Sequence, residues 1–169
     1  MFEKDWVKSE TRFVSDDWID YNGHMNMAYY VMAFDIGLDD ILDHKLGAGI
    51  RFTKAYGQGP FVLQNHVHYL GELVSGDQFY CQYLMLAGDA KRVHIAGEMR
   101  KAIKGDLVCV MEQVLINVDH ATRRATPYPR DIQDRIHQLV AAHADIPRPN
   151  QLGRAIGLNW RLRSDSPNQ

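Results

Sequence analysis

A nine-residue stretch, residues 18–26, concentrates side chains that can do chemistry. It carries one carboxylate, Asp20, one imidazole, His24, and two carboxamides, Asn22 and Asn26. A carboxylate can act as a general base or a nucleophile, and an imidazole or carboxamide can hold a water molecule or a carbonyl group. The structural alternative is equally simple, because an Asn-Gly pair favours a turn and an asparagine before an apolar run favours a helix N-cap.

The segments on either side of this stretch are expected to position it. A short strand-like run, residues 11–14, precedes it, and an amphipathic pattern follows from Asn26 to about Leu46. Spacings of three and four place apolar side chains on one helical stripe, namely Tyr30, Phe34, Leu38, Ile41 and Leu42. Gly47 lies where such a helix would end. The sequence therefore predicts a helix of about five turns with one broad apolar face to bury.

The pattern then changes from helical to alternating. Residues 47–60 are rich in glycine and are predicted to form a connecting loop. Four segments then alternate apolar and polar side chains, as half-buried strands do, over residues 61–70, 78–86, 92–103 and 107–118. Because short turns separate these segments, we expect them to pair as an antiparallel meander. A second amphipathic helix is expected over residues 131–143.

A fold class follows from this order of elements. One strand, a long helix, four strands and a second helix favour an α+β architecture in which a five-stranded antiparallel sheet wraps around one long helix. We expect a single domain over residues 1–146 and an extended or partly ordered tail over residues 147–169. The open edges of such a sheet favour self-association as a homodimer or homotetramer.

The composition excludes several classes of protein. The chain has 169 residues, of which 24% are charged, and a formal net charge of -2, so no nucleic-acid surface is indicated. No apolar run approaches the roughly 20 residues of a membrane span. The charged N-terminus lacks the apolar segment of a signal peptide, which favours a cytoplasmic location. The two cysteines, Cys81 and Cys109, lie in apolar strand-like runs and are predicted to be buried thiols.

This order of elements, together with two local motifs, resembles the hotdog-fold acyl-CoA thioesterases, in particular their 4-hydroxybenzoyl-CoA thioesterase-like branch. The first motif is residues 20–26, an Asp, two variable residues and a Gly followed by His-Met-Asn. The second is residues 68–77, which resemble the end of the family's second strand and the turn after it. The resemblance covers about residues 8–130 and implies a hotdog fold, hydrolysis of an acyl-CoA thioester and no cofactor.

A narrower resemblance is to the thioesterases of bacterial carnitine catabolism, including those fused to L-carnitine dehydrogenase. The matching segments are residues 18–26, 88–92, 141–143, 147–149 and 153–157. That family cleaves betainyl-CoA to glycine betaine and CoA, and this chain resembles its stand-alone form. Two alternatives stay open. One is a thioesterase for aromatic or medium-chain acyl-CoA or for an acyl carrier protein thioester, and the other is a hotdog protein that binds acyl-CoA without hydrolysing it.

The resemblance implies roles for the side chains of the opening stretch. Asp20 occupies the position of the family's catalytic carboxylate, which attacks the carbonyl group or deprotonates water. His24 is a candidate for orienting substrate or water or for carrying a proton, with a structural bond to a loop carbonyl as the alternative. Asn22 is equally consistent with a catalytic carboxamide and with a turn, whereas Asn26 is expected to be the helix cap. Zinc hydrolysis is not indicated, because the histidines show no ligand spacing with a third group.

Residues further along the chain are expected to complete the site. The segment that contains Gln58 and Gly59 resembles the place where the family supplies a backbone N–H to the developing oxyanion. Asn65, His66 and His68 are candidates to face the acyl pocket across a dimer interface. Alternation along a strand allows either Asn65 or the two histidines to do so, but not both. For the histidines, the favoured alternative is an ordinary position on the outer face of the sheet.

Two further groups of residues have candidate binding roles. Basic side chains near a pocket mouth bind the phosphates of CoA, and those that resemble the family's phosphate contacts are Lys91, Arg92, Arg123 and Arg124. Solvated charge pairs are the alternative for these residues. Aromatic faces bind a trimethylammonium group, and the candidates for such a cage are Trp18, Tyr21, Tyr29 and Tyr30. For these rings, core packing is the alternative.

Overall fold

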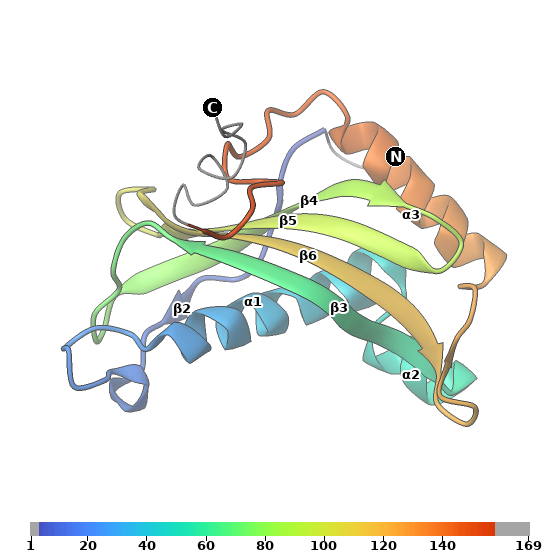
Figure 1. The fold of residues 1–169 in the computed structure, drawn as a ribbon, viewed down its shortest axis with the longest axis horizontal. Helices are drawn as coiled ribbons and strands as arrows, with labels where there is room; N and C mark the ends of the chain where they lie inside the picture. The colour runs from blue at the N-terminus through green and yellow to red at the C-terminus, as the bar shows by residue number, and fades with distance from the viewer. Residues whose placement is uncertain (1–3, 158–169) are drawn as a thin grey trace, which may run out of the picture.

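One antiparallel sheet, with a long helix against one face and a second helix beside one of its edge strands, makes up the computed structural model, which describes residues 4–157 (Figure 1). The long strands are β3 (Gln58–Tyr69), β4 (Gln78–Gly88), β5 (Arg92–Lys101) and β6 (Leu107–Asp119). The two-residue strands are β1 (Val7–Lys8), β2 (Arg12–Phe13) and β7 (Arg124–Ala125). The helices are α1 (Met27–Ile41), α2 (Ile50–Tyr56) and α3 (Arg130–His143), with a 3-10 turn η1 (Asp16–Trp18) and a π-helical turn η2 (Leu42–Leu46). We call the face that packs on α1 the inner face and the opposite face the outer face.

The strands are ordered β1-β4-β5-β6-β3 across the sheet, with β2 also paired to β4 and β7 to β6. The predicted α+β fold, a sheet wrapped around one long helix with a second helix after it, is confirmed. The place of the fifth strand is shared by the short segments β1 and β2. The predicted meander is right for β4, β5 and β6 but wrong for β3, which pairs with β6 at the far edge.

The connection between β3 and β4 explains this difference. Leu73 in this connection is buried, and its N–H donates a hydrogen bond to the Tyr30 hydroxyl on α1 (3.1 Å). The backbone carbonyl of Leu73 also accepts from the Met25 N–H (2.7 Å). The chain therefore crosses beneath the sheet, against the start of α1, before β4 begins. A turn-like sequence does not reveal such a crossing, because the anchoring contacts are with residues more than 40 positions away.

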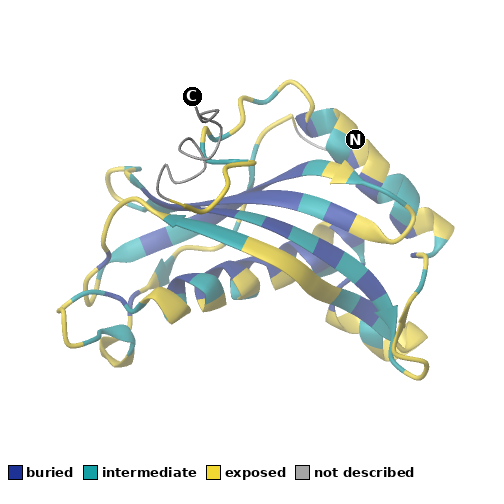
Figure 2. Cartoon of the chain, in the orientation of Figure 1, coloured by how far each residue is buried: buried dark blue, intermediate teal, exposed yellow. Residues whose placement is uncertain are grey.

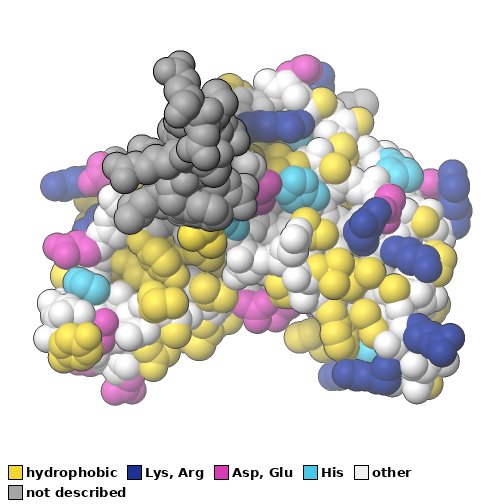
Figure 3. Space-filling view, in the orientation of Figure 1, with side chains coloured by type: hydrophobic (Ala, Val, Ile, Leu, Met, Phe, Trp, Pro, Cys, Tyr) yellow, Lys and Arg dark blue, Asp and Glu magenta, His cyan; other side chains and the backbone are white. Residues whose placement is uncertain are grey.

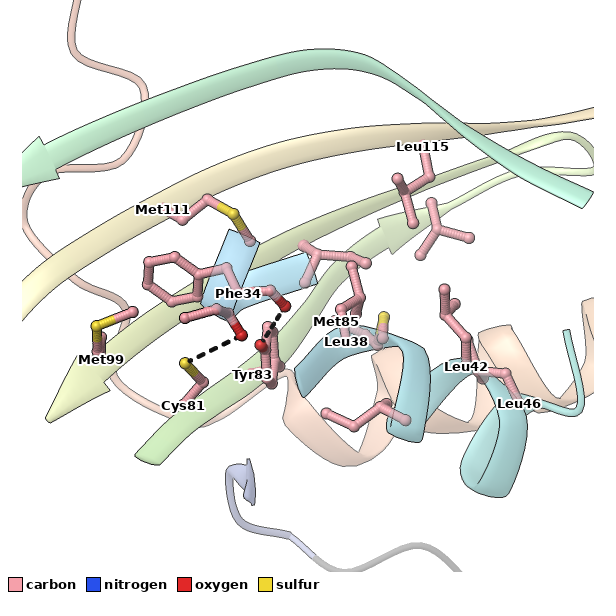
Figure 4. Close-up of a cluster of buried hydrophobic side chains, with 14 of the residues drawn as sticks. Phe34, Leu38, Leu42, Leu46, Cys81, Tyr83, Met85, Met99, Met111 and Leu115 are labelled. Carbon is pink, nitrogen blue, oxygen red and sulfur yellow. Dashed lines mark hydrogen bonds between the residues drawn. The ribbon is translucent and has the colours of Figure 1, made fainter. Parts of the chain in front are cut away.

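Helix α1 packs its apolar stripe against the inner face (Figures 2 and 4). Its buried residues are Tyr30, Ala33, Phe34, Gly37, Leu38 and Ile41. Gly37 is required here, because a Cβ at this position would lie 2.6 Å from the Tyr83 hydroxyl oxygen. That hydroxyl donates to the Phe34 carbonyl (2.6 Å) and ties β4 to the helix. The predicted helix over residues 26–46 is confirmed in position, with its last turn in π-helical form and Gly47 after it at φ 68°.

The prediction of a loop over residues 47–60 is wrong in its middle, where α2 forms. Glycines flank this seven-residue helix on both sides, Gly49 before it and Gly57 after it. Phe52 is its buried residue and contacts the rings of Tyr56 and Tyr128. A helix of two turns is too short for apolar periodicity to show, so the glycines dominated the sequence pattern. Strand β3 also begins earlier than predicted, at Gln58.

Helix α3 confirms the helix predicted over residues 131–143 and packs beside the last residues of β4, where its buried side chains join the same core as α1. Its buried residues are Ile132, Ile136, Leu139 and His143. The neutral imidazole of His143 accepts a hydrogen bond at Nδ1 from the Met85 N–H of β4 (2.9 Å). Beyond it the chain returns across the outer face, where the Gly153 N–H donates to the Glu112 carboxylate (2.7 Å). Of the predicted tail, residues 158–169 lie outside the described residues, and the domain boundary at residue 146 stays a prediction.

Candidate active site

The turn that carries Asp20 is closed by backbone hydrogen bonds. The Gly23 N–H donates to the Asp20 carbonyl (2.9 Å), and the Asp20 N–H donates to the His24 carbonyl (3.1 Å). Gly23 has φ 82°, a left-handed value that favours glycine. Met25 is buried and bonds to the connection between β3 and β4. Asp20 is therefore held on a short turn that is anchored to the core.

Two groups bind the Asp20 carboxylate. The Asn22 backbone N–H donates to Oδ1 (2.8 Å), and the Asn26 side-chain Nδ2 donates to Oδ2 (3.4 Å). Asn26 caps α1 at the same time, since its Oδ1 accepts from the Ala28 N–H (3.0 Å). The N-terminus of a helix carries partial positive charge, which favours a nearby anion. This places a half-buried carboxylate at the N-terminus of α1, where it is available as a base or a nucleophile.

Asn26 therefore has a second role that sequence reasoning missed. We predicted the cap, and the cap is present, but the contact with Asp20 was not foreseen. No local signal reveals it, because residues six apart on either side of a turn approach each other only once the turn has closed. Asn26 links the orientation of the carboxylate to the start of the helix.

The other two candidates in the turn have different positions. The His24 Nδ1 lies 3.3 Å from the Met25 carbonyl oxygen, and the ring is half-buried. This is the loop-carbonyl contact that we gave as the structural alternative. Asn22 is exposed and contributes its backbone N–H to Asp20. Catalytic roles for the His24 and Asn22 side chains stay predictions.

The four aromatic rings are not brought together as a cage within the described chain. Trp18 and Tyr29 stack on each other, with ring centroids 5.4 Å apart and planes 9° from parallel. Tyr30 is 3% exposed, and its hydroxyl bonds to the backbone of the connection between β3 and β4. Tyr21 is 96% exposed. Core packing accounts for Tyr30, and the Trp18–Tyr29 pair forms one wall beside the Asp20 turn.

Strand β3 separates two sets of candidate residues along its length. At its end, the Tyr69 hydroxyl donates to the Met27 carbonyl, the first residue of α1 (3.3 Å). At its start, the Gln58 Oε1 accepts from the Asn117 side chain (2.5 Å), and Gly59 is buried. Twelve residues of strand span about 35 Å. A single chain therefore does not bring Gln58 and Gly59 to Asp20.

The alternation along β3 places Asn65 on the inner face. Asn65 pairs with Gln113 of β6, and Val67, two residues on, packs against the core. His66 and His68 lie on the outer face, with ring centroids 4.4 Å apart. Asn65 is thus the member of this set that shares a face with α1. The histidines occupy the outer-face positions that we gave as their alternative.

The basic candidates gather at one end of the molecule, where β3 begins (Figure 3). The Lys91 Nζ donates to the Ala125 carbonyl beside Arg124 (3.3 Å). The Arg123 guanidinium lies 5.2 Å from the centroid of the Phe61 ring. Arg92 differs, because it pairs with Asp89 at 2.6 Å and lowers the pKa of that carboxyl group by hydrogen bonding. Lys91, Arg123 and Arg124 remain the candidates for phosphate contacts.

The residues that the structure describes hold neither a cluster of metal-ligating side chains nor a helix of membrane-spanning length. Within residues 4–157, no group of three or more His, Cys, Asp and Glu side chains is arranged to hold a metal ion. No helix in the same part of the chain is long and apolar enough to cross a membrane. Cys81 and Cys109 are free and buried, and burial raises the pKa of each thiol to about 12.

Comparison with known proteins identifies relatives along most of the chain. Residues 14–136 match the family described as the thioesterase-like superfamily. A betainyl-CoA thioesterase from Pseudomonas aeruginosa is 31% identical over 145 residues, which cover 86% of this chain and 91% of that protein. An L-carnitine dehydrogenase/betainyl-CoA thioesterase from Rhizobium meliloti is 28% identical over 144 residues, 85% of this chain and 29% of the larger protein.

Solved structures show the same architecture. A Staphylococcus aureus protein determined in complex with CoA superimposes with a TM-score of 0.84 at 26% identity, covering 94% of this chain and 98% of that one. A putative thioesterase from Pseudomonas putida superimposes with a TM-score of 0.77 at 28% identity, covering 91% and 97%. The expected hotdog fold is thereby confirmed.

Proposed function

We propose that this chain, which belongs to the thioesterase-like superfamily and is an acyl-CoA thioesterase, hydrolyses betainyl-CoA to glycine betaine and CoA. The observation that carries the substrate is the similarity to betainyl-CoA thioesterases along nearly the whole chain, in both stand-alone and fused forms. The position of Asp20 at the start of α1 supports the same proposal, because it supplies the carboxylate that thioester hydrolysis requires.

The chemistry is derived from the Asp20 turn. The carboxylate either removes a proton from a water molecule that attacks the thioester carbonyl, or attacks that carbonyl itself to form a mixed anhydride that water then hydrolyses. In both routes negative charge develops on the carbonyl oxygen and is stabilised by N–H donors. The C–S bond then breaks, and CoA leaves as a thiolate that takes up a proton. Asn26 and the Asn22 N–H hold the carboxylate in place during these steps.

A second copy of the chain would bring the remaining candidates to Asp20. Within residues 4–157, β3 pairs only with β6, so its other edge is open. Hydrophobic side chains are exposed along this edge, between 37% and 52%, at Phe61, Val62, Leu63, Tyr69 and Leu70. Large exposed apolar surfaces favour association, and an open strand edge favours antiparallel pairing with a copy of itself. We propose a homodimer of this kind, with a homotetramer as a further step.

Such pairing has a direct consequence for the site. When two β3 strands pair antiparallel about a two-fold axis, the start of one strand lies beside the end of the other. Gln58 and Gly59 of one subunit then approach the Asp20 turn of its partner. Arg123 and Arg124, at the same end of the sheet as Gln58, approach it as well. In this arrangement one subunit supplies the carboxylate, and the other supplies backbone donors and cations for the phosphates of CoA.

The test is a thiol-release assay over a panel of acyl-CoA esters. The panel holds betainyl-CoA, butyryl-CoA and benzoyl-CoA, and the quantity compared is kcat/KM. The proposal predicts the highest kcat/KM for betainyl-CoA. Faster hydrolysis of butyryl-CoA or benzoyl-CoA would replace the substrate assignment by the broader acyl-CoA alternative. Binding of all three esters without thiol release would identify a binding protein.

A further inference from the structure

The start of β3 and the end of β6 lie side by side, at the end of the sheet far from the Asp20 turn (Figure 1). Asn117 of β6 lies on the inner face here, two residues after Leu115, and its polar side chain is fully buried. Its Nδ2 donates to two oxygens, the Thr126 backbone carbonyl (3.2 Å) and the Gln58 Oε1 (2.5 Å). These bonds offset the cost of burying a carboxamide.

The same two bonds fix which way the Gln58 carboxamide points. A backbone carbonyl can only accept a hydrogen bond, so the Thr126 carbonyl requires the nitrogen of Asn117 on its side. That nitrogen also faces Gln58, which has to meet it with its oxygen. The Nε2 of Gln58, which carries two N–H groups, is thereby directed away from Asn117 as a donor.

Gln58 also stands at the open edge of the sheet. The His120 N–H donates to the Gly57 carbonyl (2.9 Å), so these two residues form a hydrogen-bonded pair. The next pair along the strands is Asp119 and Gln58. Because bonded and non-bonded pairs alternate between antiparallel strands, the backbone of Gln58 faces the open edge and that of Gly59 faces β6. Of these two residues, Gln58 is therefore the one that presents N–H donors to a partner subunit.

We propose that the Gln58 carboxamide is a catalytic donor, whose Nε2 gives a hydrogen bond to the thioester carbonyl oxygen in the partner's site, and that Asn117 is its positioning residue. This proposal rests on the function and the dimer proposed above, in which the Gln58 end of one subunit approaches the Asp20 turn of the other. Negative charge develops on the carbonyl oxygen during attack and passes to the sulfur when the C–S bond breaks. A donor that is already oriented stabilises this charge without reorganisation.

Two variants of Gln58 test the donor. Gln58→Leu removes it, and Gln58→Glu replaces it by an oxygen while keeping an oxygen that accepts from Asn117. We expect kcat to fall by about 100-fold in both variants, for every ester that the enzyme hydrolyses, with little change in KM. A kcat within about threefold of the unaltered value in both variants would overturn the role of Gln58, since a missing oxyanion donor costs far more. A loss confined to KM would overturn it as well.

Gln133→Leu is the matched control for these variants. Gln133 is a half-buried glutamine of α3, and its Nε2 donates to the Tyr128 carbonyl (2.7 Å). Its replacement also removes one carboxamide and one hydrogen bond, but kcat should equal that of the unaltered enzyme.

Asn117→Leu tests the positioning role in two backgrounds. In the otherwise unaltered enzyme it should lower kcat, because Gln58 is no longer held in one orientation. In Gln58→Leu it should lower kcat no further, because the donor that it positions is already absent. A merely structural role would act equally in both backgrounds, so equal losses would overturn the role of Asn117.

A mixed dimer tests whether the donor acts across the interface. One subunit carries Asp20→Asn and the other carries Gln58→Leu, with different affinity tags, so that the mixed dimer can be purified from cells that make both. If each site takes Asp20 from one subunit and Gln58 from the other, one site of the mixed dimer keeps both residues. Its turnover should then recover to about half that of the unaltered dimer.

The mixed dimer also separates this proposal from the substrate proposal. Turnover no higher than the mean of the two parent variants would place Asp20 and Gln58 in different sites and overturn the proposal. The comparison holds for any ester that is hydrolysed. A preference for an uncharged ester would therefore overturn the assignment of betainyl-CoA and leave that of Gln58 intact.

Discussion

Replacement of Asp20 by asparagine separates its chemical role from its structural one. Asparagine has the same shape, and its Oδ1 can still accept from the Asn22 N–H (2.8 Å in the native turn). Its Nδ2 takes the place of Oδ2, so the long hydrogen bond from Asn26 (3.4 Å) is lost. One such bond is worth about 0.5–1.5 kcal/mol. The melting temperature of Asp20→Asn should therefore fall only slightly.

The effect on turnover should be far larger. An amide can neither take a proton from water nor attack a carbonyl group at neutral pH. Loss of a general base typically costs about 10²–10⁴-fold in rate, which corresponds to about 2.7–5.4 kcal/mol in the activation barrier. We expect kcat to fall by at least this factor for every ester that the enzyme hydrolyses, while binding of CoA is retained.

A chromogenic disulfide reagent can follow the release of CoA at pH 7.5. The protein's own thiols do not interfere, because Cys81 and Cys109 are buried and protonated at this pH, with pKa values of about 12. Asp17→Asn is the matched control, since Asp17 is an exposed carboxylate three residues earlier in the chain. Loss of a general base should lower kcat far more than threefold. If the kcat of Asp20→Asn stayed within about threefold of that of the unaltered enzyme, Asp20 would have no place in the mechanism.

Three further predictions concern the phosphates, the dimer and acid stability. Alanine at both Arg123 and Arg124 should raise KM for betainyl-CoA with little change in kcat. KM for betainyl-pantetheine, which lacks the nucleotide phosphates, should stay unaltered. Equal increases of KM for both substrates would exclude phosphate contacts. Val62→Lys places a charge on the exposed edge of β3 and should convert the proposed dimer to monomers, with loss of activity. Light scattering measures the molecular mass, and an unchanged mass would place the interface elsewhere. Burial lowers the pKa of His143 below its ordinary value of 6.5, so the unfolded chain binds a proton that the folded chain does not, and stability should fall as the pH drops below about 6.5. In His143→Gln the side-chain oxygen can still accept from the Met85 N–H. The free energy of unfolding of this variant, measured with urea, should depend less on pH in this range, and an unaltered pH dependence would contradict the assignment to His143.

The elements that periodicity predicts are those whose burial is local and regular. Helix α1 and helix α3 have apolar stripes at helical spacing, and the long strands alternate, so their positions followed from the sequence. The partner of β3 did not follow, because it depends on the path of residues 70–77 beneath the sheet and on the bond between Leu73 and Tyr30. Helix α2 was missed because its seven residues contain too few turns to establish a period.

The site was predictable in position but not in its contacts. The spacing of Asp20 and Asn26 indicated a reactive turn before a helix, and the structure places both there. The bond between their side chains required the closed turn. Gln113 of β6 shows the same limit, since alternation places it on the inner face but does not reveal that its carboxamide oxygen has no hydrogen-bond partner among the described residues. Within the described residues Trp18 and Tyr29 stack on each other, an arrangement that their spacing in the sequence does not reveal, and the aromatic cage stays a prediction.

Competition between two esters in one reaction tests the central claim most directly. The unaltered enzyme is given equal concentrations of betainyl-CoA and 3,3-dimethylbutyryl-CoA, an uncharged ester in which a tert-butyl group replaces the trimethylammonium group. Mass spectrometry follows the disappearance of each ester. Because the two esters compete, the ratio of their initial rates equals the ratio of their kcat/KM values. An acyl-CoA thioesterase that recognises the cationic acyl group should consume betainyl-CoA first, by at least about tenfold. Equal consumption, or a preference for the uncharged ester, would contradict betainyl-CoA as the substrate.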